Sequence, residues 1–346
     1  MKRNFDRREF LAASAAASAV IVLPSTASAQ ALEKKKLTIA VGGKNLLYYL
    51  PLTIAEQLKY FQAEGLEVEI VDFAGGARAL QAVVGGSADV VSGAFEHTLN
   101  MQQKGQPMRA FVLQGRAPQI VLAVSTKTMG SYKSLADLKG KKIGVTAPGS
   151  STNIMANFVL AKAGVRPADV SYIGVGASQG AVAAIRAGQV DAISNLDPVI
   201  TILQRAGDIR IISDTRDPVE SEKVFGGPMP AACLYAPVSF VEKNPNTAQA
   251  LTNAIVRANK WIQQAGPSEV IKVVPESYLL GDRAVYIDAF LKAKGALSPD
   301  GIFPDAGSAT ALRALASVDE AMATAKLDLK ANYTNEFARR ANQKYK

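Results

Sequence analysis

The chain has 346 residues, of which 48% are hydrophobic and 20% charged, so it is long enough for two packed domains and too apolar for a disordered chain. Its one Cys, Cys233, and its one His, His97, exclude an internal disulfide and a zinc site built from Cys and His, and we expect no metal or other cofactor. The formal charge of +9 comes without a basic run interleaved with aromatics, which argues against a nucleic-acid partner and allows an anionic ligand.

Residues 1–29 are predicted to be a twin-arginine signal peptide. The motif DRREFL at 6–11 is followed by an Ala-rich apolar run at 11–23 and by small residues that resemble a cleavage site. That run is shorter than the ~20 apolar residues that a membrane-spanning helix needs, and no Cys for a lipid anchor follows it directly. We therefore expect export to the periplasm with cleavage near Ala29 or Ala31, which removes four basic and two acidic residues and leaves a charge of +7.

A first α/β unit is expected to begin directly after this signal. Residues 37–41 read as a strand that ends in a Gly-rich loop with two tyrosines. A helix is expected from Pro51 to Phe61, because proline is favoured in the first helical turn, and the alternating run at 66–72 predicts a second strand. Two further apolar runs are expected to complete the sheet of this unit: residues 108–114 and 119–125.

Residues 75–96 and 176–198 repeat one pattern. Each copy reads as a small-residue helix, a Gly that ends it, an Asp and a short apolar strand, and Asp89 of the first copy aligns with Asp191 of the second. Each strand ends in a serine, Ser92 in the first copy, and opens into a loop. Because ligands of open α/β sheets bind at the carboxyl ends of strands, the repeat predicts two lobes that face each other across a cleft.

The rest of the chain continues as α/β and then becomes helical. Residues 126–134 read as the first crossing between the lobes, and 231–236 read as a strand that returns to the first lobe. The expected lobes are therefore 36–126 with 236–346, and 127–235. Between the crossings, strands are expected at 142–146, 170–174 and 209–213, and helices at 151–163 and from Pro198. Helices are expected after residue 239 at 246–264, 283–294, 309–325 and in the tail from 332 to 346.

By these segments the chain resembles the substrate-binding proteins of ABC importers, in particular the group for nitrate, sulfonate, taurine and thiamine-pyrimidine precursors. The likeness covers nearly all of the mature chain. The matching pieces are YYLPLTIAEQLKYFQAEGLEVEIVDFAGG (48–76), GSADVVSGA (86–94), SLADLKGKKIGVTAPGSSTN (134–153), AGQVDAISNLDP (187–198) and YTNEFARRA (333–341). The resemblance implies a type II periplasmic binding fold of two α/β lobes, each a mixed sheet flanked by helices, with the ligand cleft between them. It also implies delivery to a membrane permease driven by an ATPase.

The start of the helix expected at 151–163 is the first candidate site. A helix N-terminus leaves backbone N–H groups unpaired and carries a partial positive charge, which suits a carboxylate, sulfonate or phosphate. An ordinary N-cap, in which a hydroxyl serves only its own helix, is the alternative. The side chains that would add donors to an anion are Ser150, Ser151, Thr152 and Asn153.

Further candidates lie in the loops after the strands. Tyr48 or Tyr49 would stack on a ring or enclose an alkyl chain, next to Asn45. Glu96 opposes a simple anion pocket, because it would accept from an amine or an amino-pyrimidine, or pair with Arg116. Arg116 would instead clamp a carboxylate, or lie on the surface. The other loop candidates are Ser92, His97, Asn195 and Asp197, of which Asp197 is expected to be a helix N-cap.

The expected function is that of a monomeric, non-catalytic solute receptor. It would close by a hinge over a small organic anion, such as a sulfonate, a taurine-like molecule or an aromatic carboxylate, and would dock on an ABC permease and its ATPase. One alternative is a protein that binds or synthesises a thiamine pyrimidine precursor. The synthases of the resembling group carry a Cys-rich motif and a histidine chemistry, which one Cys and one His do not supply. The other alternative is a periplasmic sensor subunit.

Overall fold

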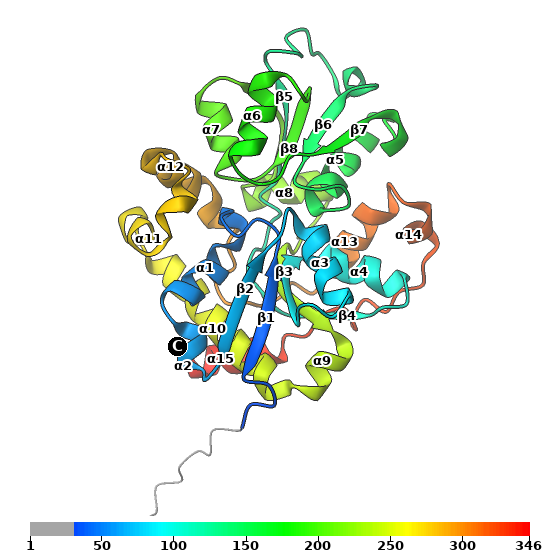
Figure 1. The fold of residues 1–346 in the computed structure, drawn as a ribbon. Coiled ribbons are helices and arrows are strands. Elements are labelled where there is room, and N and C mark those ends of the chain that lie inside the picture. The colour runs from blue at the N-terminus through cyan, green and yellow to red at the C-terminus, as the bar shows by residue number, and fades with distance from the viewer. Residues whose placement is uncertain (1–30) are drawn as a thin grey trace, which may run out of the picture. The chain divides into compact units, whose positions relative to one another are not determined.

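The computed structural model describes residues 31–346, so the predicted signal peptide at 1–29 lies outside the described residues. Strands and helices alternate through the first two thirds of this range, and only helices follow residue 237 (Figure 1). Within the described residues, no helix is long and apolar enough to cross a membrane. The α-helices are α1 (Leu50–Gln57), α2 (Tyr60–Ala63), α3 (Gly76–Val84), α4 (Glu96–Gln103), α5 (Ser151–Ala161), α6 (Gln179–Ala187), α7 (Val199–Arg205), α8 (Pro218–Phe225), α9 (Val238–Lys243), α10 (Pro245–Gln264), α11 (Pro267–Val273), α12 (Arg283–Ala293), α13 (Gly307–Ala316), α14 (Glu320–Thr324) and α15 (Glu336–Lys344).

Five strands form a first sheet in the order β2-β1-β3-β10-β4. These strands are β1 (Lys36–Val41), β2 (Glu67–Asp72), β3 (Val90–Ala94), β4 (Met108–Leu113) and β10 (Ala232–Pro237). β1 runs parallel to β2 and β3, whereas β10 is antiparallel to both its neighbours, β3 and β4. β3 is buried along its whole length, as expected of a central strand that is covered on both faces.

A second sheet has five strands in the order β7-β6-β8-β5-β9 and follows the same plan. Its strands are β5 (Val121–Ser125), β6 (Lys142–Val145), β7 (Ser171–Gly174), β8 (Ala192–Asn195) and β9 (Ile209–Asp214). β6 is parallel to β7 and β8, and β5 is antiparallel to β8 and β9. β5 is the first strand that the chain forms after leaving the first sheet, and β10 is the first that it forms on its return. Each of them lies inside its sheet and is antiparallel to both its neighbours. The predicted fold of two mixed sheets with flanking helices is confirmed (Figure 1).

The expected position of residues 119–125 in the first sheet is wrong. Residues 121–125 of this run form β5, which pairs with β8 and β9 in the second sheet. The chain therefore crosses at 114–120, before the segment 126–134 that the sequence suggested, and it returns between β9 and β10. A short, uniformly apolar strand carries no local signal of its partners, because antiparallel pairing is decided by residues far away in the chain.

The repeated Asp has the same structural task in both halves. The Asp89 carboxylate accepts a hydrogen bond from the backbone N–H of Thr38 in β1, and Asp191 accepts one from Lys142 in β6, each at 3.0 Å. Asp89 precedes β3 and holds the neighbouring strand β1, and Asp191 precedes β8 and holds the neighbouring strand β6. The helix before each Asp ends near a glycine of positive φ, +78° at Gly86 and +72° at Gly188, which glycine adopts without strain. The repeat therefore stabilises the same strand pairing in two similar sheets.

Two of the expected helices are each split into two. Lys59 adopts a left-handed backbone with a φ of 58°, so the helix predicted at 51–61 becomes α1 and α2. The helix predicted at 309–325 becomes α13 and α14, because the Asp319 carboxylate accepts from the backbone N–H groups of Ala321 and Met322 and so starts a new helix.

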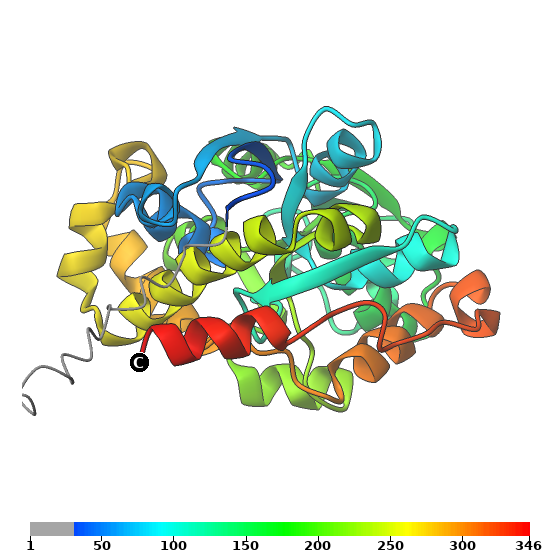
Figure 2. The ribbon, with the colours of Figure 1, turned by 90° about the horizontal axis from the view of Figure 1, so that it is seen from below.

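The C-terminal helices pack mainly around the first sheet. α10 contacts α1 and β4, and α15 lies alongside α10, as Figure 2 shows from below. α13 reaches both α4 and α5, and α12 reaches α7 of the second half as well as η1 (Leu47–Tyr49). The C-terminal region thus contacts both halves of the α/β structure.

Candidate functional site

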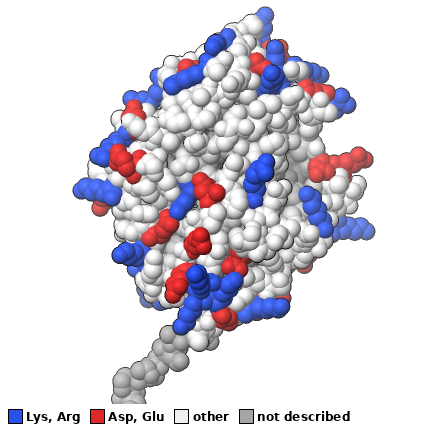
Figure 3. Space-filling view, in the orientation of Figure 1, with Lys and Arg blue, Asp and Glu red and all other residues white. Residues whose placement is uncertain are grey.

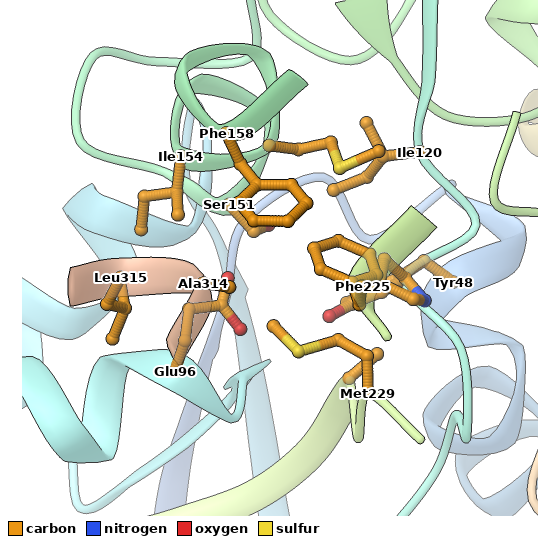
Figure 4. A pocket seen from close by; sticks show the side chains of 13 residues that line it. Tyr48, Glu96, Ile120, Ser151, Ile154, Phe158, Phe225, Met229, Ala314 and Leu315 are labelled. Atoms are coloured by element: carbon orange, nitrogen blue, oxygen red, sulfur yellow. The ribbon is translucent and has the colours of Figure 1, made fainter. Parts of the chain in front are cut away.

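A narrow cavity lies where the two sheets face each other. The space inside it that a water molecule's centre can occupy is about 20 Å³, which is room for about one water molecule. Its walls come from both halves of the chain and from both crossing segments (Figure 4). The lining residues are Tyr48, Glu96, Pro118, Ile120, Ser151, Ile154, Met155, Phe158, Phe225, Met229, Ala231, Ala314 and Leu315.

The walls of this cavity are almost entirely apolar. The polar groups in the lining are those of Glu96, Ser151 and Tyr48, and none of the lining residues is Lys, Arg or His. The rings of Phe158 on α5 and Phe225 on α8 are stacked, with centroids 4.9 Å apart. Walls of this kind enclose the apolar body of a ligand and leave its orientation to a few polar groups.

The positive net charge is not gathered into one visible patch. On the face drawn in Figure 3, basic and acidic side chains are interspersed. Because the cavity lining itself contains no basic side chain, the excess of Lys and Arg supplies no direct partner for an anion inside the cavity.

Glu96 is the one acid of the cavity. It begins α4, directly after the end of β3, and only 4% of its surface is exposed. Burial raises the pKa of its carboxyl to about 7, and a hydrogen bond from its own backbone N–H opposes this shift. Within the described residues the carboxyl has no ion-pair partner, and Arg116, the partner considered for it, is exposed and donates from Nε to the Gly295 carbonyl at 2.8 Å.

His97 is buried and is not among the residues that line the cavity. Its Nδ1 is 3.0 Å from the hydroxyl of Tyr235 in β10. Burial lowers the pKa of His97 to about 4, although the nearby carbonyl of Gly149 favours the charged form. The geometry to that carbonyl is not that of a hydrogen bond, and Nε2 is buried without a partner among the described residues. A neutral imidazole is therefore the form that this environment favours.

The start of α5 uses most of its polar side chains inside the protein. Ser150 Oγ accepts from the backbone N–H of Ala77, in the first turn of α3, at 3.0 Å. Thr152 Oγ accepts from the Thr146 N–H at 3.1 Å and lies 2.9 Å from the Thr146 hydroxyl. Asn153 Oδ1 accepts from the Gly149 N–H at 2.9 Å. Of the four candidates on this loop, Ser151 is the one that reaches the cavity.

Replacing Thr152 with valine should therefore cost stability. We expect the free energy of unfolding to fall by about 1–3 kcal/mol, because the buried N–H and hydroxyl of Thr146 lose their partner. Ser151→Ala is the matched control, since that hydroxyl faces the cavity, and its effect should stay within about 0.5 kcal/mol. Chemical unfolding of both variants measures the difference. A larger loss for Ser151→Ala would reverse the roles assigned to the two hydroxyls.

The remaining candidates from the sequence hold loops in place. Asn45 Nδ2 donates to the Ala177 carbonyl at 3.0 Å, and Asn195 Nδ2 donates to the Gly176 carbonyl at 3.0 Å. Ser92 Oγ accepts from Gln114 Nε2 at 2.9 Å. The ring of Tyr49 meets that of Tyr48 edge to face, with centroids 4.8 Å apart, and Tyr48 is the one of the two that lines the cavity.

Asp197 belongs to a buried ion pair that the sequence did not reveal. The N-cap residue of α7 is Pro198 and not Asp197 as predicted, but Asp197 Oδ1 still accepts from the Thr201 N–H in the first turn of this helix at 2.8 Å. Asp197 Oδ2 is 3.2 Å from Nη1 of Arg216, and Nη2 of the same guanidinium is 2.6 Å from Oδ2 of Asp214. Burial raises the pKa of Asp197, and the charge of Arg216 opposes that shift.

Direct hydrogen bonds close the space between the two halves. The Leu47 N–H donates to the Asp197 carbonyl at 3.1 Å, in addition to the bonds from Asn45 to Ala177 and from Ala77 to Ser150. The crossing segments also lie side by side, because the Gln119 N–H donates to the Thr215 carbonyl at 3.1 Å. The two halves are thus in direct contact around the cavity.

Most of the apolar lining was missed by the sequence analysis. Phe158 could have been predicted from the sequence, because residues 151, 154, 155 and 158 share one face of an α-helix. The remaining lining residues that were missed lie on distant segments without a common pattern: Pro118, Ile120, Phe225, Met229, Ala231, Ala314 and Leu315.

Comparison with known proteins gives the following matches. The model of the NMT1-like family matches residues 30–274. A solved protein from Bordetella bronchiseptica RB50 is 64% identical, with a TM-score of 0.90 over 91% of this chain and 99% of that one. The alkanesulfonate-binding protein SsuA from Xanthomonas axonopodis pv. citri is 21% identical, with a TM-score of 0.66 over 90% of this chain and 99% of its own. The structural similarity shows that this chain has the fold of a periplasmic binding protein.

Among curated proteins, a 4-amino-5-hydroxymethyl-2-methylpyrimidine phosphate synthase, THI13 of Saccharomyces cerevisiae (strain ATCC 204508 / S288c), is also similar. It is 22% identical over 236 residues, which are 66% of this chain and 67% of that protein. Similar sequences thus include both a named binding protein and a named enzyme.

Proposed function

Because the chain belongs to the NMT1-like family, we propose that it is the solute-binding component of an ABC importer, which traps a small molecule between its two lobes. The observation that carries this proposal is the position of the cavity, whose walls come from both halves of the chain and both crossing segments. A ligand held there touches every part that has to move when two lobes close, so its binding energy favours the closed arrangement.

The lobes of this proposal follow the two sheets. One lobe is built on β1 to β4 and β10 with most of the C-terminal helices, and the other on β5 to β9. Residues 114–120 and 215–231 would be the hinge, because they are the two connections between the sheets. A permease with its ATPase is the proposed partner, and the periplasm, reached through the signal at 1–29, is the proposed location.

The expectation of a small organic anion has limited support from the cavity. The N-terminus of α5 offers a partial positive charge beside Ser151. The lining contains no basic side chain to pair with a sulfonate or a carboxylate. An aromatic carboxylate fits the apolar walls better than taurine, because most of its surface is apolar.

Native mass spectrometry of protein purified from the periplasm of its own host tests the importer proposal. We expect one small molecule bound per monomer, released unchanged after denaturation. A pyrimidine-precursor synthase would instead consume the molecule on incubation, and that result would replace the binding function with an enzymatic one. A sensor would also return the molecule unchanged, and it is distinguished by the absence of a permease and an ATPase in the neighbouring genes.

Gly75 provides a direct test of closure. It has a φ of +100°, and a Cβ on it would lie 2.8 Å from the Cβ of Ala147, which belongs to the other half. Gly75→Ala should therefore hold the lobes apart and raise the radius of gyration measured by small-angle X-ray scattering. Gly86→Ala is the control, because it also places an alanine at a positive φ, +78°, but its Cβ would meet no atom within 4 Å. Equal scattering from both variants would contradict closure at this contact.

A further inference from the structure

The carboxyl of Glu96 is a polar group without an assigned task. It is more than nine-tenths buried, and Figure 4 shows its oxygens directed toward the middle of the cavity, among the side chains of α5, α8 and α13. Its own backbone N–H favours the charged form of the carboxyl, and within the described residues no other residue is found to donate a hydrogen bond to it. A buried carboxyl normally has a partner, because leaving it without one costs free energy.

The titratable groups around Glu96 do not neutralise it. Four other titratable side chains interact with its charge: Tyr48, Tyr49, Tyr235 and Cys233. Burial is the main cause that raises the pKa of each of them, and the negative charge of Glu96 raises it further. These groups therefore stay uncharged around neutral pH. His97 is neutral as well, because burial lowers its pKa. A carboxylate at this position thus meets no positive charge from the protein.

These surroundings distinguish between ligand classes. A sulfonate or carboxylate in the cavity would lie beside a group that becomes negative and would find no basic side chain in the lining. A protonated amine would pair with Glu96 and satisfy its hydrogen-bonding capacity. Because the cavity as it stands has room for about one water molecule, the two lobes have to part to admit such a ligand, and the apolar walls with the rings of Phe158 and Phe225 would then enclose a hydrocarbon or aromatic body.

We propose that the molecule bound in this cavity is an apolar amine, whose protonated nitrogen donates hydrogen bonds to the Glu96 carboxylate. This inference rests on the proposed binding function and names its ligand class. Binding of such an amine fixes Glu96 in its charged form, so the affinity rises as the pH increases through the pKa of the free carboxyl.

Three probes with the same body test the proposal: 2-phenylethylamine, 2-phenylethanol and 2-phenylethanesulfonate. Calorimetric titration at pH 6 and pH 8 measures their dissociation constants. We expect the amine to bind best, and roughly tenfold more tightly at pH 8 than at pH 6, because Glu96 with a pKa of about 7 gains its charge between these values. Glu96→Gln should weaken the amine by about tenfold to a hundredfold and leave the alcohol nearly unchanged.

The control variant is Glu222→Gln, which neutralises an exposed acid on α8 that does not line the cavity and should leave the affinity for the amine unchanged. Three results would each overturn the ligand class. They are tighter binding of the sulfonate than of the amine, an affinity of Glu96→Gln for the amine equal to that of the wild type, and binding of none of the three probes. The binding function itself is judged separately, by the unchanged molecule that purifies from the host and by the Gly75→Ala scattering.

Discussion

Replacing Arg216 with methionine should lower the free energy of unfolding by about 3–5 kcal/mol, the cost of breaking a buried ion pair from one side. Only 5% of Arg216 is exposed, and its guanidinium contacts Asp197 at 3.2 Å and Asp214 at 2.6 Å. Methionine fills a similar space but leaves the carboxylate of Asp197 buried without its counter-charge. The pair also supports the closed cleft, because the Asp197 carbonyl accepts the hydrogen bond of Leu47 from the other half.

A matched surface pair provides the control for this effect. Arg186 and Asp208 are 2.8 Å apart, with about half of the Arg186 side chain exposed to solvent. Arg186→Met should therefore cost less than about 1 kcal/mol. The double variant Asp197→Asn with Arg216→Met should recover part of the stability, because the buried Asp197 no longer carries an unpaired charge, whereas Asp214, which also loses Arg216, is partly exposed to solvent. A loss in Arg216→Met that is no larger than in Arg186→Met, both measured by chemical unfolding, would contradict this role of burial.

Glu96→Gln should make the protein more stable at pH 8 by about 3 kcal/mol, since each unit of pKa shift corresponds to ~1.4 kcal/mol. Burial raises the pKa of Glu96 from 4.5 to about 7, so between these values the folded state binds more protons than the unfolded state. The contribution of the acid to stability is thus fully present below pH 4.5 and is lost as the pH rises toward 7. Glutamine keeps the shape of the neutral carboxyl and never pays this cost.

The pH profile of the two proteins provides the measurement. Glu96→Gln and the wild type should differ little at pH 5 and increasingly up to pH 8. His97 acts in the opposite direction in both proteins, because its pKa falls from 6.5 to about 4 on burial, and its contribution is lost as the pH falls through that range. Glu222→Gln, an exposed acid on α8, should stay within about 0.5 kcal/mol of the wild type at each pH. A pH-independent difference for Glu96→Gln would show that its carboxyl is not desolvated.

The two sites at Glu96 and Arg216 manage buried charge in different ways. Arg216 and its two acids are paired with each other, so the protein gains a fixed connection between β9 and the start of α7. Glu96 is left without such a partner within the described residues. A ligand that supplies the missing donor therefore recovers free energy that folding has lost there. This difference is the physical reason for assigning a structural role to the first site and a binding role to the second.

The sequence alone determined the features that depend on neighbours in the chain. Periodic apolar residues predicted α10 to within one residue, and the repeat around Asp89 and Asp191 predicted two similar α/β units. It also placed Ser151 at the start of a helix and Glu96 directly after a strand, and both residues line the cavity. Such local patterns are readable because helix and strand periodicity is set by residues a few positions apart.

Only the tertiary structure decided which distant segments meet. It placed β5 in the second sheet, joined Arg216 to Asp197, and used the hydroxyl of Thr152 to hold Thr146. It also assembled an apolar cavity from segments as far apart as Pro118 and Ala314, which left Glu96 buried and without a basic partner in that lining. Burial and pairing depend on what packs against a residue from elsewhere in the chain, and that information is absent from the local pattern on which sequence analysis depends.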